Sequence, residues 1–116
     1  MQAIYNKEGE TVGWLSYRDL FDKCGAYIGF IKGHGVYNLK SKYCGSLKQS
    51  VFRDAKGLVV AFMKGAKKVS FLPALRTSPN EPTKKPKPVI KPIGSAPSPT
   101  SFKAQWSRLD WSQFIA

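Results

Sequence analysis

Apolar and polar positions alternate in a pattern that repeats every 16 residues through the first 66 residues of this 116-residue chain. Each copy begins with a short apolar stub, passes through a polar turn and continues as a longer, mostly apolar segment. The four copies run IYNKEGETVGWL (residues 4–15), LFDKCGAYIGFI (20–31), VYNLKSKYCGSL (36–47) and FRDAKGLVVAFM (52–63). No insertion or deletion interrupts them, which indicates one supersecondary unit used four times.

Each copy turns at an Asn or Asp that is followed three residues later by a small residue. The pairs are Asn6 and Gly9, Asp22 and Gly25, Asn38 and Ser41, and Asp54 and Gly57. An Asn or Asp side chain hydrogen-bonds backbone two residues on, and glycine accepts a positive φ. The pattern predicts a β-hairpin closed by a type I turn with a left-handed residue after it. Because serine tolerates positive φ less well, we expect the third turn to be the loosest or differently built.

The segment after each turn keeps a fixed order of residue types. An aliphatic position (Val12, Ile28, Cys44, Val60) precedes a small one (Gly13, Gly29, Gly45, Ala61) and then one that is mostly aromatic (Trp14, Phe30, Ser46, Phe62). Strand side chains alternate faces, so we expect the aliphatic and aromatic positions on one face and the small residues on the other. We interpret the small residues as hairpins crowding round a pseudo-fourfold axis, with four independent bulges as the alternative.

The composition changes after residue 66. All eight prolines lie at or beyond Pro73, and nine of the ten glycines lie at or before Gly65. We therefore divide the chain into a hairpin domain (1–66), a basic Pro-rich linker (67–100) and an amphipathic C-terminal segment (101–116). Spaced prolines favour extended backbone over helix. The linker is predicted to be solvated; the alternatives are a basic strap on an acidic partner and a Pro-rich ligand for an aromatic groove.

The C-terminal segment is predicted to form a short amphipathic helix capped by Ser101. Its apolar residues near helical spacing are Phe102, Trp106, Leu109 and Phe114, with Trp111 about a quarter-turn off the stripe. A hairpin domain of 66 residues has a marginal core, so we expect this segment to dock on the hairpins and complete it. Docking on another protein or on a second copy of the chain is the alternative. The predicted fold class is all-β: four β-hairpin repeats round a pseudo-fourfold axis, a Pro-rich extended tail and a short C-terminal helix.

Side chains suited to catalysis are few. His34 is the sole histidine, and the two cysteines, Cys24 and Cys44, occupy non-equivalent repeat positions without a catalytic or metal-binding signature. We predict that the chain is not an enzyme and uses no metal or cofactor. The alternative is a small enzyme that uses His34 with a cysteine, which requires His34 to lie partly buried beside Cys24 or Cys44.

Charge is the strongest indication of function. The formal net charge is +12, which favours an acidic partner or nucleic acid. Round a common axis, lysines at the strand ends would form a ring beside Arg18, although lysine there also prevents edge pairing. The binding candidates are Lys32, His34, Lys48, Lys64 and Lys67, and in the linker Lys84, Lys85, Lys87 and Lys91. We expect an acidic protein partner, with sequence-independent DNA or RNA binding as the alternative and Tyr17, Tyr27 and Tyr43 as candidates for base stacking.

The chain shows no sign of a leader or of a membrane span. Its start lacks a basic region followed by an apolar run, and no apolar stretch reaches the length of a transmembrane helix. Two cysteines outside any disulfide framework are typical of a reducing compartment. We therefore expect a cytoplasmic protein that contacts no membrane.

The repeat, written as aromatic–Asn/Asp–x–x–Gly–x–x–aliphatic–Gly–aromatic, resembles the bacterial four-fold β-flower family. The likeness covers residues 3–66 and extends to the tail through a Trp-Ser…Phe segment, Trp106-Ser107 to Phe114. It implies hairpins round a central pseudo-fourfold axis and implies no catalytic residues. Departures from the repeat stand at Ser41, Ser46 and Arg53.

Overall fold

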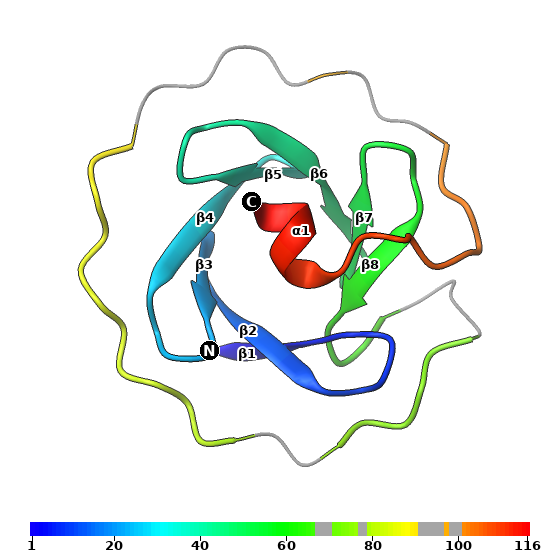
Figure 1. Cartoon of the computed structure of the whole chain (residues 1–116), viewed down its shortest axis with the longest axis horizontal. Coiled ribbons are helices and arrows are strands. Elements are labelled where there is room, and N and C mark those ends of the chain that lie inside the picture. The colour runs from blue at the N-terminus through cyan, green and yellow to red at the C-terminus, as the bar shows by residue number, and fades with distance from the viewer. Residues whose placement is uncertain (67–70, 77–78, 91–96, 98–100) are drawn as a thin grey trace.

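A computed structural model describes residues 1–66, 71–76, 79–90, 97 and 101–116. Eight antiparallel strands form a closed barrel in chain order, each paired with the next, and β8 returns to β1 through Tyr5 and Phe62 (Figure 1). The strands are β1 (Gln2–Tyr5), β2 (Thr11–Ser16), β3 (Asp19–Asp22), β4 (Tyr27–Lys32), β5 (Gly35–Asn38), β6 (Tyr43–Lys48), β7 (Val51–Asp54) and β8 (Val59–Phe62). Helix α1 (Trp111–Ile115) follows near the C-terminus and lies across one end of the barrel. The predicted all-β fold of four hairpins is confirmed.

The four hairpin tips share one hydrogen-bond pattern. At each tip the Oδ1 of the Asn or Asp accepts backbone N–H groups from the residues two and four positions on, at 2.8–3.0 Å. The residue three positions on has positive φ: 77° at Gly9, 90° at Gly25 and 86° at Gly57. Ser41 also adopts φ 61°, and its N–H bonds to the Asn38 carbonyl at 3.0 Å, as in the other copies. The expectation of a differently built third turn is therefore wrong, because the Asn38 side chain holds the same backbone conformation.

A β-bulge in every hairpin changes which residues face the core. In the first hairpin Ile4 pairs with Gly13 but Tyr5 pairs with Thr11, which leaves Val12 as an extra residue. Equivalent register shifts occur in the other three hairpins. Val12 consequently packs against the interior cluster, whereas Trp14 belongs to a separate outer cluster. The predicted sharing of one face by aliphatic and aromatic positions is wrong, because the bulge breaks the strict alternation of strand side chains. Bulges and a common axis are both present.

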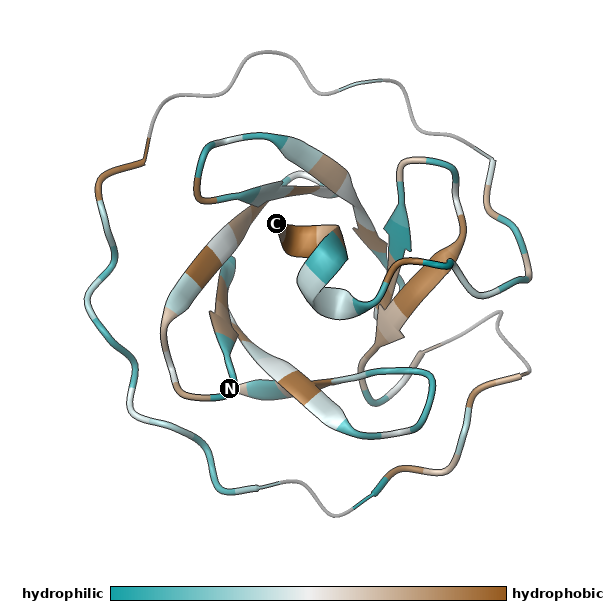
Figure 2. Cartoon of the chain, in the orientation of Figure 1, coloured by the Kyte–Doolittle hydropathy of each residue, from teal (hydrophilic) through white to brown (hydrophobic). Residues whose placement is uncertain are grey.

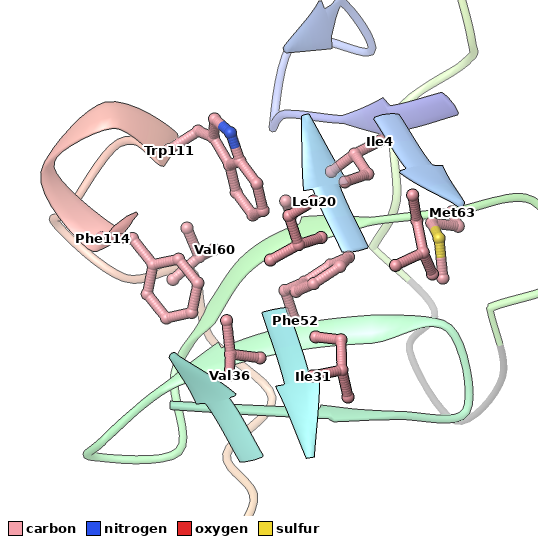
Figure 3. Close-up of a cluster of buried hydrophobic side chains, with 11 residues drawn as sticks. Ile4, Leu20, Ile31, Val36, Phe52, Val60, Met63, Trp111 and Phe114 are labelled. Atoms are coloured by element: carbon pink, nitrogen blue, oxygen red, sulfur yellow. The ribbon is translucent and has the colours of Figure 1, made fainter. Parts of the chain in front are cut away.

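The barrel interior holds one residue from each repeat at the same level. Ile4, Leu20, Val36 and Phe52 are completely buried there. Trp111 and Phe114 of α1 lie on one side of this layer, and Ile31 and Met63 lie on the other (Figure 3). Helix α1 carries both hydrophobic and hydrophilic residues, so it can close the barrel with one face and meet water with the other (Figure 2).

The outer wall carries cross-strand pairs that explain two departures from the repeat. Three of these pairs are aromatic: Trp14 with Phe21, Phe30 with Tyr37, and Phe62 with Tyr5. The fourth joins Ser46 to Arg53, so the two departures are one contact. Arg53 donates to the carbonyls of Gly57 at 2.8 Å and Lys103 at 2.5 Å, and its guanidinium lies 4.6 Å from the Phe102 ring centre. An aromatic pair is thus exchanged for an arginine that fastens the C-terminal segment.

The described parts of the linker lie as a belt outside the barrel, against the hairpin tips (Figure 1). The N–H groups of Arg76, Lys85 and Lys103 bond the carbonyls of Gly9, Gly25 and Gly57, each at 3.0 Å. Arg76 and Lys85 are nine residues apart and Lys103 is eighteen further on, so one belt step of nine residues matches one repeat of sixteen. The midpoint between Lys85 and Lys103 lies outside the described residues. The predicted solvated linker is therefore wrong for these points of contact.

The last segment crosses the rim of the barrel before α1 begins. Trp106 forms a parallel bridge with Val59, whose N–H and carbonyl bond Gln105 at 2.9 Å and Ser107 at 2.7 Å. The Ser107 hydroxyl donates to Asp54 Oδ2 at 2.6 Å. The predicted helix start at Ser101 is wrong: the N-cap is Asp110, because residues up to Ser107 must stay extended to pair with β8. Gln113 completes a capping box with Asp110.

Candidate partner-binding face

The turns between hairpins gather cations at the end of the barrel opposite α1. These turns join β2 to β3, β4 to β5 and β6 to β7, and a further turn follows β8. We call the surface that they form the basal face; its exposed cationic residues are Arg18, Lys32, Lys48 and Lys64, with His34 beside them. Lys32, Lys48 and Lys64 occupy equivalent positions in successive repeats. The strand pairing therefore brings together the lysines that the sequence predicted as a ring.

One carboxylate occurs in the described part of these turns, and its charge is compensated. Asp19 Oδ1 lies 3.4 Å from Lys87 Nζ and accepts a hydrogen bond of 3.1 Å from the Tyr27 hydroxyl. Burial raises the pKa of Tyr27, and the neighbouring Asp19 raises it further. Because Tyr27 is buried and held edge-on against Phe21, its proposed base-stacking role is wrong.

The belt adds two of its lysines to the edge of the basal face. Lys84 Nζ lies 5.8 Å from the ring centre of Tyr17, and Lys87 reaches Asp19 in the same turn. Lys85 instead fixes the belt through its backbone at Gly25, and its side chain is exposed. Lys67 and Lys91 lie outside the described residues.

Helix α1 occupies the other end of the barrel, where charge is mixed. Tip lysines lie there beside carboxylates; the exposed charged residues of the tips are Lys7, Glu8, Glu10, Lys23, Lys40 and Lys56. Sequence reasoning did not single out these lysines. Their alternation with Glu8 and Glu10 makes this end a weaker candidate for an acidic partner than the basal face.

Comparison with known families agrees with this geometry. A family model described as "4-fold beta flower protein" matches residues 2–115. The chain belongs to this family. The match includes the belt and α1, so these parts belong to the β-flower together with the barrel. Comparison with curated proteins and with solved structures gives no match.

In this β-flower the histidine and the cysteines do not form a common site. His34 is exposed in a basal turn, with Nδ1 3.3 Å from the carbonyl oxygen of Leu47. Leu47 and Cys44 lie near opposite ends of β6, about 10 Å apart at the usual strand rise. Cys24 is exposed in a hairpin tip. The partly buried Cys–His pair that a His34-based enzyme requires is absent from the described residues.

The C-terminal residues predicted to dock divide into two groups. Trp111 and Phe114 are buried in the core of the same chain. Trp106 packs edge-on against Phe62 and Phe71, which joins the two ends of the belt at β8. Phe102 and Leu109 are 44% and 41% exposed. Trp111, which lay off the predicted stripe, is buried because the helix begins nine residues later than Phe102.

Two ionisable groups report on the end of the barrel that α1 covers. Hydrogen bonds from Gln113 N–H and the Ser112 hydroxyl lower the pKa of Asp110. Burial raises the pKa of the Cys44 thiol, whose Sγ lies 3.5 Å from the Lys42 carbonyl oxygen. No helix in the described ranges has the length and apolarity needed to cross a bilayer.

Alkylation should separate the two thiols of the folded chain. We expect iodoacetamide at pH 8 to modify exposed Cys24 at least about tenfold faster than Cys44, because burial disfavours the Cys44 thiolate and limits access. Mass spectrometry of peptides after timed quenching measures both rates, and the urea-unfolded chain supplies the control with similar rates. Equal rates in the folded chain would contradict the packing of Cys44 beside α1.

Proposed function

We propose that this β-flower is a non-enzymatic binding module whose basal face contacts an acidic protein partner. The observation that carries the proposal is the placement of Lys32, Lys48 and Lys64 at equivalent turns round one axis, all exposed. The nearby carboxylate, Asp19, already has Lys87 as its partner. The face therefore offers cations without competing acids in the described turns.

The barrel makes this arrangement rigid, which favours recognition of a partner. Backbone hydrogen bonds brace the turns: Ile31, Leu47 and Met63 donate to the carbonyls of Arg18, His34 and Ser50 at 2.8–2.9 Å. A preorganised set of like charges loses little entropy on binding and speeds encounter with an oppositely charged surface. The net charge of +12 supports the same preference for an anionic partner.

The test compares two triple variants that remove the same charge from opposite ends of the barrel. Fluorescence anisotropy with labelled poly-glutamate measures binding at low and moderate salt. We expect K32Q/K48Q/K64Q to weaken binding about tenfold or more, since each exposed cation contributes a few tenths to one kcal/mol. The matched control is K7Q/K23Q/K56Q in the hairpin tips, which we expect to change affinity by about threefold or less through the long-range field alone.

Equal losses in the two triple variants would show that net charge, and not the basal face, determines binding. A parallel titration with single-stranded DNA and RNA separates the acidic-protein proposal from nucleic-acid binding. Much tighter and steeply salt-dependent binding of the oligonucleotides would overturn the protein partner.

A further inference from the structure

Tyr17 adopts a backbone conformation that its turn reserves for glycine. Tyr17 and Arg18 form the two-residue loop between the paired residues Ser16 and Asp19. Of the two loop residues, Tyr17 alone has positive φ, at 56°. Positive φ at the first loop residue alone is the pattern of a type II′ turn, in which glycine is expected there. For a bulky side chain such a φ is strained.

The equivalent loops show what this position requires. Gly33 has φ 61° and Gly65 has φ 86° at the corresponding places, and Gln49 has φ 54° in a loop where Ser50 also has positive φ. Two of the four repeats thus use glycine. Tyrosine is the bulkiest residue found at this position.

Packing does not compensate the strain. Tyr17 is 94% exposed, and the contact that its ring makes is with the Lys84 ammonium at 5.8 Å. An exposed side chain contributes little burial, so the stability of the barrel does not account for an aromatic residue here. A strained conformation that the fold does not need indicates a functional role.

The neighbours of Tyr17 define the chemistry of the site. Arg18 is exposed beside it, Lys84 lies over its ring, and Asp19 is engaged by Lys87. We call Tyr17, Arg18 and Lys84 the Tyr17 corner. Tyrosine and arginine are the residue types that most often dominate binding energy at protein interfaces. Arginine binds a carboxylate through two parallel hydrogen bonds.

We propose that the Tyr17 corner is the anchor point for the acidic partner and recognises a segment in which acidic and apolar residues are interleaved. Arg18 and Lys84 bind carboxylates of the segment, and the Tyr17 ring packs against the apolar side chain between them. The inference rests on the proposed function of the basal face. A lone exposed aromatic in the described basal turns favours a peptide over a nucleic acid, because single-strand binding uses several rings for successive bases.

The experiment compares Tyr17→Gly with Gln49→Gly in the full chain. Gln49 occupies the equivalent loop position, so its replacement relieves positive φ without changing the Tyr17 corner. The probes are poly-glutamate and a peptide of alternating Glu and Phe with the same number of carboxylates. We expect the unaltered chain and Gln49→Gly to prefer the alternating peptide about tenfold, a typical contribution of an aromatic anchor.

Tyr17→Gly should abolish that preference and leave poly-glutamate binding within about twofold. Both variants should unfold about 2–5 °C higher than the unaltered chain, because glycine adopts positive φ without strain. A lower unfolding temperature for Tyr17→Gly would overturn the strain on which the inference depends.

The outcomes distinguish this inference from the proposed function. If neither peptide binds, the basal face is not an acidic-protein site and both proposals fail. If poly-glutamate binds but Tyr17→Gly keeps the preference for the alternating peptide, the Tyr17 corner fails and the basal face stands. If oligo(dT) binds more tightly than both peptides and loses affinity in Tyr17→Gly, the ligand is a nucleic acid and the peptide inference is overturned.

Discussion

Trp111→Ala is expected to lower the free energy of unfolding by about 3–5 kcal/mol, the range for truncating a buried tryptophan. Trp111 is 6% exposed, and its ring centre lies 5.1 Å from that of Phe52 and 5.6 Å from that of Phe114. A methyl group cannot fill the space between α1 and the middle layer of the barrel (Figure 3). The loss is large for a chain of this size because typical domains have only about 5–15 kcal/mol of stability.

Urea denaturation followed by circular dichroism measures the effect, with Leu109→Ala as the matched control. Leu109 lies two residues earlier in the same segment and is 41% exposed, so its truncation should cost about 1 kcal/mol or less. Similar losses for the two variants would show that α1 does not contribute to the core of the barrel.

Gly45→Ala is expected to destabilise the chain by about 3 kcal/mol, at the upper end of the usual range for overpacking. A Cβ at Gly45 would overlap the backbone carbonyl of Arg53 and lie 2.8 Å from Cε1 of Phe114. The carbonyl belongs to the adjacent strand and cannot rotate away as a side chain can. Either the β6–β7 pairing or the seat of α1 must therefore shift.

Gly13→Ala provides the graded comparison in the same unfolding assay. A Cβ there would lie 2.8 Å from the Phe21 carbonyl oxygen and 3.3 Å from Trp111 Nε1, so we expect a loss of about 1 kcal/mol. The fourth repeat already has Ala61, at the seam where β8 and β1 share a single registered pair. A loss at Gly13 equal to or larger than that at Gly45 would contradict the packing order derived from these distances.

The hairpins were predictable from sequence because each tip is stabilised within itself. Asn6 bonds the backbone of residues two and four positions later, and Gly9 supplies the positive φ, so the signal lies in five consecutive residues. The same locality explains why the repeat, and with it the β-flower resemblance, could be read directly. The ring of Lys32, Lys48 and Lys64 followed from equal spacing once a common axis was assumed.

The orientation of the strand side chains was not predictable by simple alternation. The extra residue at Val12 shifts the register between Ile4 and Tyr5, and no residue type in that stretch marks a bulge uniquely. Tyr27 was assigned to the surface for this reason, although it is buried. The pairing of Ser46 with Arg53 was hidden likewise, because two departures seven residues apart become one contact only when β6 and β7 are in register.

The belt carried a signal that sequence reasoning overlooked. Pro79, Pro88 and Pro97 are nine residues apart, as are Pro73 and Pro82. This spacing equals the step between the belt hydrogen bonds at Arg76 and Lys85. Composition alone favoured a solvated linker, since Pro-rich and Lys-rich segments usually fail to fold by themselves. Here the hairpin tips supply the partners.

By itself the sequence determined the four hairpins, their turns and the lysines at their ends, because these depend on contacts within about five residues and on a constant period. The tertiary structure decided the face of each strand, the course of the belt, the start of α1 and the isolation of His34 from both cysteines. Those features rest on contacts between distant residues, such as Arg53 with Lys103 and Trp111 with Phe52. Local propensity does not specify such contacts, and they form only when the barrel closes and presents its tips and its open end to the rest of the chain.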